Sequence, residues 1–536
     1  MIKNNQKLIN VALGKQRADL VIKNAKYLNV YTGEILQADI AIKDGYIAGI
    51  GSYEGNKSYY TDGLVVPGFI DGHVHIESSM ALPSSFAIQA FKHGTTTVIC
   101  DPHEIANVAG EYGIRFMIED SVGADVDFKF MLPSCVPSTP IDESYKRLGE
   151  SELRPLYKNK SVIGLAEVMD VGAVISGNED MMAKINYARS FGKAVDGHAP
   201  ILSGNALNGY VVAGIRSDHE CTTYQEGLEK LRLGQYIMVR QGTAAHNLKA
   251  LKPLVEKYPN RCMFVTDDMH PELLLEKGHV DRIIREAVAL GVDMVKAITC
   301  ATLTPSEYFG LSDRGAIAPG LRADLAVLDG DLNVIDSFSG GSKRTAKKQA
   351  WGFGGFNAKP IAIEDLYDSD NRIISLVKEQ LITNEGGVAS KADERKDIVK
   401  LFAYERHHGT GHKASCYLSG YGLKKGAIAT SIAHDSHNII AAGYDEHIVT
   451  AVNELIKIGG GIVVTDGQRV LTLPLEVGGI MSSRSIESLA HELDEIKKFA
   501  FSLGVTDGVD PFMTLSFLSL PVIPSIRLLP SGVVTL

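Results

Sequence analysis

Close pairs of cysteine are missing from this chain of 536 residues. No C-x-x-C pair occurs, and the six cysteines lie far apart, at Cys100, Cys135, Cys221, Cys262, Cys300 and Cys416. This distribution argues against a disulfide framework and a zinc knuckle, and is typical of reduced thiols in a protein core. The opening segment MIKNNQKLIN also lacks the apolar stretch of a signal peptide, so we expect a cytoplasmic protein.

Basic clusters and long apolar runs are missing as well. The formal net charge is −10 and no segment carries a dominant basic stripe, which argues against a sequence-independent nucleic-acid binder. The most apolar late run, MTLSFLSLPVIPSI, is interrupted by Pro521 and Pro524 and is too short to span a bilayer. We therefore expect neither a nucleic acid nor a membrane as a partner.

Strand-forming segments at two distant places indicate a small β domain. Apolar and polar residues alternate early in the chain, with turn signals at YTGE and KDGY, and a similar pattern returns after the middle. We expect one small β-sandwich domain built from residues 1–65 and 311–360, with a larger domain at 66–310 inserted between them. Residues 361–536 carry strand and helix signals of their own and predict an additional C-terminal α/β domain.

The middle of the chain divides into eight short apolar runs that end in polar residues. They are LVVPGFIDGHVH, GTTTVICDPHE, FKFMLPSCVP, SVIGLAEVMD, KAVDGHAP, GIRSDHE, YIMVRQG and CMFVTDD. Amphipathic segments such as EDMMAKINYARSF and HVDRIIREAVALG separate most of them, with apolar residues at helical spacing. This pattern predicts an α/β fold of the (β/α)8 TIM-barrel type. An open doubly wound sheet is the alternative, but it would usually have fewer strands and a glycine-rich phosphate turn.

Histidines and carboxylates stand at the ends of these runs. In VPGFIDGHVHIESSM, His73 and His75 are two residues apart at a strand end, so their side chains point to the same side. A barrel gathers the carboxyl ends of its strands at one face, where five more residues then join this pair: Glu167, His198, His219, Asp267 and Asp268. Such a ligand mix is typical of a site for two divalent ions, with Glu167 placed to bridge them.

Each of these residues alone has an ordinary structural explanation. A lone buried histidine is more often a hydrogen-bonded core residue than a ligand. Burying this many titratable groups without a cation, however, would cost several kcal/mol for each group. We therefore predict a two-metal site, which lowers the pKa of bound water toward about 7 and permits hydrolytic attack on an electrophilic carbon. Asp267 is placed to take the proton of that water and pass it to the leaving group.

Several motifs resemble a known family. PGFIDGHVHIESS and GLRADLAVL resemble the amidohydrolase superfamily, whereas DPHEIANV, GLAEVMD, DGHAPILSGNALNGYVVAGIRSDHECT, TDDMHP, AHDSHN and DPFMTLSFLSLPVIP resemble bacterial adenine deaminases. The resemblance implies conversion of adenine and water to hypoxanthine and ammonia in purine salvage, with two divalent ions per chain, manganese or iron. It implies the ligands His73, His75, Glu167, His198, His219 and Asp267, with Glu167 as the bridge where many relatives use a carboxylated lysine. Asp267 is taken rather than Asp268 because it directly follows the strand threonine.

The acid that protonates the purine ring is left open by the sequence. Attack at C6 disrupts an aromatic ring, so a ring nitrogen must gain a proton as the oxygen adds. Because GHAPILSG has no glutamate after its histidine, the candidates are Glu77, Glu104 and Glu220, each of which equally fits a role in orienting a ligand histidine. We favour Glu77, since Ser78 and Ser79 beside it are candidates to contact the purine edge.

Two further histidine motifs have more than one interpretation. His103 follows the second run and is a candidate for a third metal ligand or a substrate contact, with a purely structural histidine as an equal alternative. The segment AHDSHN contains His434, Asp435, His437 and Asn438. It is a candidate to close over the barrel mouth and contact the substrate, or to bind an additional ion, against a plain surface turn.

The sequence is also compatible with functions other than adenine deamination. Another binuclear amidohydrolase reaction, either cyclic amide hydrolysis or deamination of a different nucleobase, is the main alternative. A non-catalytic barrel that serves as a binding or assembly module is disfavoured, because every expected ligand is present. The large apolar C-terminal domain favours self-association, so we expect a homo-oligomer that acts on a small molecule.

Overall fold

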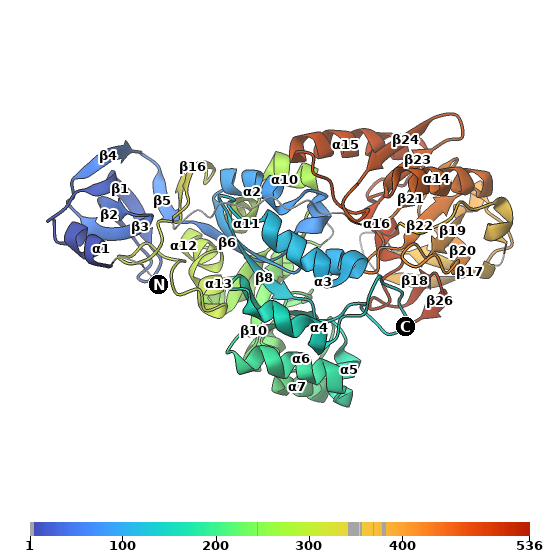
Figure 1. Cartoon of the computed structure of the whole chain (residues 1–536), viewed down its shortest axis with the longest axis horizontal. Helices are drawn as coiled ribbons and strands as arrows, with labels where there is room; N and C mark the ends of the chain where they lie inside the picture. Colours follow the sequence, from blue (N-terminus) through green and yellow to red (C-terminus); the bar gives the residue numbers. More distant parts are fainter. Residues whose placement is uncertain (1–4, 244, 341–352, 354–355, 368, 378–381) are drawn as a thin grey trace.

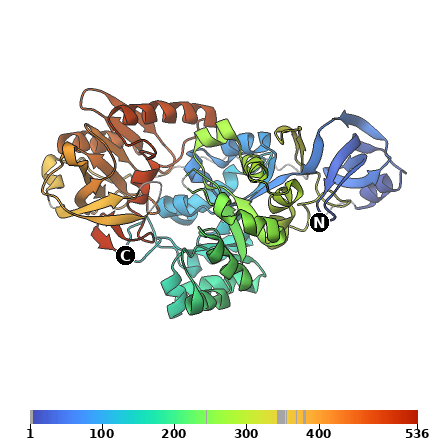
Figure 2. The same cartoon turned by 180° about the vertical axis from the view of Figure 1, so that it is seen from behind.

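Three domains lie in a row along the long axis of the molecule (Figures 1 and 2). The computed structural model describes residues 5–243, 245–340, 353, 356–367, 369–377 and 382–536. The small β domain lies at one end, the barrel in the middle and the C-terminal domain at the other end. Parts of the predicted segments 311–360 and 361–536 lie outside the described residues, and the predicted domain limits stay predictions.

Eight parallel strands form the predicted barrel, and each of the eight apolar runs supplies one of them. Hydrogen bonds give the strand orders β10-β9-β8-β7-β6-β14 and β11-β12-β13. The short β14 continues the line of β13 and pairs in parallel with β6, which joins the last strand to the first. The strands are β6 Phe69–His75, β7 Thr95–Cys100, β8 Asp127–Leu132, β9 Val162–Val168, β10 Ala194–Gly197, β11 Ser217–Asp218, β12 Tyr236–Arg240, β13 Cys262–Val265 and β14 Asp267–Asp268.

The barrel strands are apolar along their length because helices cover the outside and side chains fill the inside. Every residue of β6 and β7 is buried. The amphipathic segments predicted as helices form α6 and α11. The covering helices are α2 Pro83–Lys92, α3 His103–Asp120, α4 Glu150–Leu153, α5 Val171–Ser176, α6 Glu179–Ser190, α7 Gly204–Ala213, α8 Tyr224–Arg232, α9 Leu248–Lys257, α10 Pro271–Lys277, α11 Val280–Ala289, α12 Met294–Cys300 and α13 Leu303–Tyr308. In the described parts of the chain, no helix has the length and apolarity needed to cross a membrane.

The two flanks of the barrel meet in one small β domain, as predicted. Strand β15 pairs antiparallel with β5, so segments more than 200 residues apart lie side by side. The seven strands are connected by hydrogen bonds in the order β16-β15-β5-β1-β2-β3, with β4 paired to β1. The elements are α1 Asn5–Ala12, β1 Ala18–Asn29, β2 Glu34–Lys43, β3 Tyr46–Gly51, β4 Gly55–Tyr60, β5 Leu64–Pro67, β15 Leu325–Leu328 and β16 Val334–Phe338.

The C-terminal domain is built on an eight-stranded sheet of order β18-β17-β20-β19-β22-β21-β23-β24. Its strands are β17 Ser369–Leu376, β18 Thr383–Val388, β19 Ile398–Tyr404, β20 Lys413–Ser419, β21 Ala427–Thr430, β22 Ile439–Gly443, β23 Gly461–Thr465 and β24 Val470–Pro474. Three helices and a hairpin complete it: α14 Asp445–Ile458, α15 Ile486–Ser502, α16 Met513–Phe517, β25 Ile526–Leu529 and β26 Gly532–Thr535.

One continuous apolar cluster joins this domain to the barrel. It includes Ile105 and Leu132 of the barrel and Ile440 and Leu475 of the C-terminal domain. The loop between β21 and β22, residues 431–438, consequently reaches the cavity at the carboxyl ends of the barrel strands.

Candidate metal centre

The predicted ligands meet at the carboxyl ends of the barrel strands. Some of them lie in the last residues of β6, β9 and β14, and the others directly follow β10 and β11. Nε2 of His75 lies 3.1 Å from Oδ1 of Asp267 and 3.3 Å from Oε1 of Glu167. Nε2 of His73 lies 3.3 Å from the same Asp267 oxygen. These side chains are separated by almost 200 residues in the sequence but form one cluster of possible metal ligands.

Glu167 lies between two pairs of histidines. Its Oε2 is 2.8 Å from Nδ1 of His198 and 3.1 Å from Nε2 of His219. Its Oε1 is the oxygen nearer to the other pair, 3.3 Å from His75 and 3.9 Å from His73. A carboxylate that offers one oxygen to each pair has the arrangement of a bridging ligand between two cations.

The surroundings of Glu167 fit a divalent metal. Burial alone would raise the pKa of this carboxyl, but hydrogen bonds from His103, His198, His219 and His75 outweigh it and hold the pKa well below its usual range. Oε1 is buried, with Nδ1 of His103 at 3.2 Å and Nε2 of His75 at 3.3 Å. An ionised carboxylate enclosed by imidazoles is a donor set suited to borderline divalent ions.

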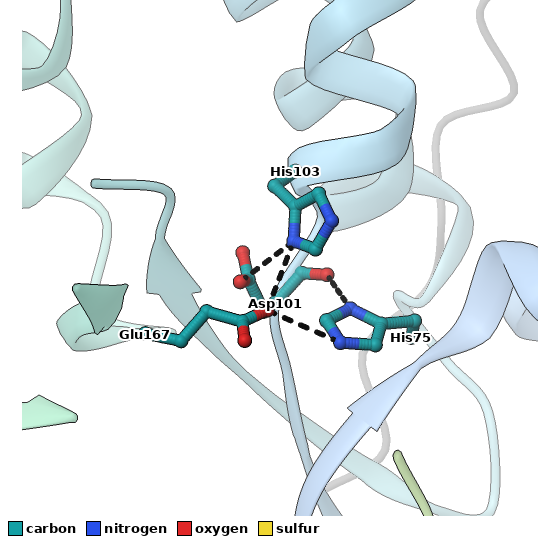
Figure 3. Close-up of side chains that lie close together, drawn as sticks. All are labelled: His75, Asp101, His103 and Glu167. Atoms are coloured by element: carbon teal, nitrogen blue, oxygen red, sulfur yellow. Dashed lines mark hydrogen bonds and ion pairs between the residues drawn. The ribbon is translucent and has the colours of Figure 1, made fainter. Parts of the chain in front are cut away.

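A second group of donors joins the centre from β7 and the start of α3. Figure 3 shows His75, Asp101, His103 and Glu167 pointing toward one another. Nδ1 of His103 lies 2.9 Å from Oδ2 of Asp101 and 3.2 Å from Oε1 of Glu167. Nδ1 of His75 donates a hydrogen bond to the backbone carbonyl of Asp101 at 3.1 Å. The lone pair of the ring is then on Nε2, which is the candidate ligand nitrogen.

Arg240, at the end of β12, connects Asp267 to Glu220. Its Nη1 lies 2.8 Å from Oδ2 of Asp267 and 2.5 Å from Oε1 of Glu220. Burial alone would raise the pKa of Asp267, but the charge of Arg240 and hydrogen bonds from His73 and His75 hold it well below its usual range. Asp267 is therefore an ionised carboxylate, able to accept a proton.

The turn that carries Asp267 is conformationally unusual. Its φ of 58° lies in the left-handed region that residues other than glycine rarely adopt. Gly242 packs directly against this turn, and a Cβ there would come within 2.4 Å of the carbonyl oxygen of Asp268. A glycine at position 242 is thus required for the turn to approach the strand beside it.

Asp71 holds the first and last strands of the barrel in register below the centre. Its fully buried carboxylate accepts the backbone N–H groups of His73 and Thr266, each at 3.2 Å, and the hydroxyl of Thr266 at 2.5 Å. Nε2 of His279 lies 3.1 Å from the same group. One side chain thereby positions both the His73 segment and the turn of Asp267.

An open cavity lies over the centre, and two domains line it. The barrel contributes ligands and charged side chains, including His103, Glu104, Glu220, Arg240 and Asp268. The C-terminal domain contributes His434, Asp435, Phe517, Leu520 and Ile523. The ring of His434 stacks on Phe517 with centroids 4.6 Å apart. The cavity therefore combines a metal-binding floor with an aromatic and aliphatic wall.

Glu77 and three predicted substrate contacts, Ser78, Ser79 and His437, do not line this cavity. The carboxylate of Glu77 accepts the N–H of Ile105 at 3.1 Å, and the hydroxyl of Ser79 donates to the carbonyl of Ile76 at 2.6 Å. The hydroxyl of Ser78 lies between Glu104 and Asp268, which line the cavity, but Ser78 does not line it. Glu77 and Ser79 therefore brace the local backbone.

Three charged residues of the centre were missed by the sequence analysis. Asp101 and Arg240 stand at the ends of the second and seventh runs, DPHE and YIMVRQG, so the strand-end rule that found the ligands covers them. Asp71 is two residues before His73 and shares its side of the strand. A search of every charged strand-end residue would have found Asp101 and Arg240, and a search of the inward-facing side of the first strand would have found Asp71.

Comparisons with known proteins agree with this geometry. Residues 64–351 match the amidohydrolase family, and residues 373–536 match the adenine deaminase C-terminal domain. Adenine deaminase 2 of Carboxydothermus hydrogenoformans is 44% identical, over 98% of this chain and 97% of its own. The chain belongs to the adenine deaminase family.

Other adenine deaminase relatives also match over nearly the full length. Adenine deaminase of Desulfatibacillum aliphaticivorans is 42% identical, over 99% of this chain and 98% of its own. Among solved structures, N-acetyl-D-glucosamine-6-phosphate deacetylase from Mycobacterium smegmatis is 16% identical, with a TM-score of 0.45 over 60% of this chain and 98% of that one. The predicted membership of the adenine deaminase family is confirmed, and the donor groups identify a divalent-metal centre.

Proposed function

We propose that this member of the adenine deaminase family hydrolyses adenine to hypoxanthine and ammonia with two divalent ions per chain. The observation that supports it is the carboxylate of Glu167 between two pairs of histidines, with ionised Asp267 beside one pair and a cavity above. The curated relatives at 44% and 42% identity carry the name adenine deaminase. We propose manganese or iron(II) as the ions, since imidazole and carboxylate ligands accept both.

The chemistry divides between the ions and the side chains. Two bound divalent ions would lower the pKa of a water molecule toward about 7, so that its oxygen attacks C6 of the purine. Asp267 accepts a proton from that water and gives it to the departing amine. Arg240 keeps Asp267 ionised and fixes one of its oxygens at 2.8 Å, so that the other faces the histidines.

We propose Glu220, rather than Glu77, as the group that carries a proton to the purine ring. Glu220 lines the cavity, and its Oε1 lies 3.6 Å from Nδ1 of His198 and 3.4 Å from Nε2 of His219. Burial alone would raise the pKa of Glu220, but the charges of Arg240, His198 and His219 lower it, so this carboxylate is ionised and ready to take a proton from the attacking water. Glu104 also lines the cavity, but it faces the histidines of the C-terminal domain.

Glutamine substitutions separate these carboxyl groups. Glu220→Gln is expected to reduce kcat for adenine by about 10²-fold, because the amide cannot carry a proton to the ring. Glu77→Gln is expected to keep most of the activity, since the glutamine oxygen still accepts the N–H of Ile105. Steady-state kinetics on both variants at equal metal content is the measurement. A larger loss in Glu77→Gln than in Glu220→Gln would return the acid role to Glu77.

The proposed reaction is tested by ammonia release. Protein loaded with manganese(II) is expected to release ammonia from adenine in a coupled assay, and to release much less from guanine and cytosine under the same conditions. A cyclic amide, followed by ring opening, serves as the test of the alternative amidohydrolase reaction. Turnover of the cyclic amide with no ammonia from adenine would overturn the proposal.

We also propose a cytoplasmic homo-oligomer. All six cysteines are free and buried, which supports a reducing compartment. The side chains of Ile175, Phe191, Ile201 and Val212 come from the neighbouring region of α5 to α7 and are each more than half exposed. Exposed apolar residues on these helices and on the loops between them support self-association through this region.

A further inference from the structure

A separate group of possible metal ligands lies beside the metal centre described above and shares no residue with it. It consists of Glu104, at the start of α3, and of His434 and His437, in the loop between β21 and β22. One ligand atom of each lies within 4.8 Å of those of the other two. Nε2 of His437 is 3.5 Å from Oε2 of Glu104, and Nδ1 of His434 is 3.9 Å from Oε1.

His437 is the residue least satisfied by the protein itself. Its side chain is completely buried, and neither ring nitrogen has a hydrogen-bond partner among the residues that the structure describes. Burying a polar group without such a partner costs about 1–3 kcal/mol. Nε2, directed toward Glu104, is placed to donate its lone pair to a cation.

Negative charge is crowded on the other side of Glu104. The hydroxyl of Ser78 lies 3.1 Å from Oε1 of Glu104 and 2.6 Å from Oδ1 of Asp268, but it has one hydrogen and can donate to one carboxylate only. Buried Oε2 of Glu77 has no hydrogen-bond partner among the described residues. Among the residues that the structure describes, Glu104 forms ion pairs with His434 and His437 and none with lysine or arginine.

A single proton on Glu104 serves either Ser78 or His437 but not both, whereas a cation neutralises Glu104 and accepts the lone pair of His437. We propose that Glu104, His434 and His437 bind a third divalent cation, separate from the pair at Glu167. Metal–ligand bonds of about 2.1 Å put the donors of a tetrahedral site about 3.4 Å apart, so only small shifts are needed. Two imidazoles and one carboxylate suit zinc, iron(II) or manganese(II).

The position of this site gives it a role between domains. Glu104 belongs to the barrel, and the two histidines belong to the C-terminal domain. Glu104 and His434 both line the cavity, whereas His437 lies behind them. The third cation therefore holds the C-terminal loop against the barrel at the cavity wall, whichever molecule the cavity accepts.

Metal counting tests the proposal without an activity assay. Metal-free protein is dialysed against manganese(II) alone, desalted and analysed by inductively coupled plasma mass spectrometry. Wild-type protein is expected to hold about three ions per chain, and His437→Gln about two, because the ligands around Glu167 are intact. His447→Gln, on α14 of the same domain, is the matched control and is expected to keep about three. Two ions in wild-type protein, or an equal count in wild type and His437→Gln, would overturn the proposal.

Anomalous diffraction from manganese-soaked wild-type crystals provides a second measurement that needs no variant. A third peak is expected between Glu104, His434 and His437, in addition to two peaks around Glu167. Two peaks at Glu167 with none at the three residues would reject the site even if His437→Gln does not fold. Both measurements are independent of the reaction, so a protein inactive on adenine but holding three ions would refute the proposed function alone.

Discussion

Replacement of Asp267 by asparagine is expected to lower kcat for adenine by about 10³-fold while most of the bound metal remains. The amide keeps the shape of the side chain but cannot accept the proton of the attacking water. Metal is retained because His73, His75 and Glu167 still surround the site. The measurement is kcat at saturating adenine, divided by the metal content of the same sample.

Asp268 offers a matched control for this prediction. It is one residue further along, lines the same cavity and carries the same charge, but its oxygen accepts the hydroxyl of Ser78 instead of facing the histidines. Asp268→Asn is therefore expected to lose much less activity than Asp267→Asn. If both variants lost the same amount, general loss of negative charge in the cavity would explain the effect, and the proton-transfer role of Asp267 would be wrong.

The barrel and the clustering of its candidate ligands could be predicted because they follow from a local rule. A parallel strand buried on both faces is a short apolar run, and the first polar residues after it lie at the catalytic face. His198 and His219 each follow directly after a strand, whereas His73 lies within β6, two residues before its end. The pairing of the two flanks in the small β domain could also be predicted, because apolar and polar residues alternate in both segments as they do in half-buried strands.

The position of Glu77 outside the cavity lining has a local physical cause. In a continued strand Glu77 would share the side of His73 and His75. The strand ends at His75, however, and Ile76–Ser79 forms a 3-10 turn. The turn ends the alternation and directs the carboxylate of Glu77 to the backbone N–H of Ile105. Strand spacing is therefore unreliable from the first residue beyond a strand end.

The sequence offered a place for AHDSHN at the barrel mouth only as one of several alternatives, and in the structure His434 and Asp435 of this segment line the cavity. AHDSHN is visible as a motif, but its place depends on how two domains dock, and docking is fixed by the shapes of whole surfaces. The apolar cluster that unites Ile105 with Ile440 and Leu475 draws on residues more than 300 positions apart. No local pattern encodes that contact, so the relation of His434 to Glu104 appeared only in the folded chain.

Replacement of Glu167 by glutamine is expected to remove metal and activity together. An ionised carboxylate offers an anionic oxygen to each pair of histidines, whereas an amide has one neutral oxygen and a nitrogen that cannot bind a cation. We expect the variant to lose at least one ion from the Glu167 centre and to lose about 10³-fold or more in kcat/KM for adenine. Metal analysis after desalting, paired with kinetics, is the measurement.

Comparing Glu167→Gln with Asp267→Asn separates metal binding from proton transfer. One variant keeps metal and loses turnover, and the other loses both, so the two roles are distinguished within one site. Glu179→Gln, an exposed change at the start of α6, controls for the substitution itself and is expected to match wild type in both measurements. A Glu167→Gln protein that retained the full metal content would show that the ions are held without a bridging carboxylate. The proposed bridging role of Glu167 would then be wrong.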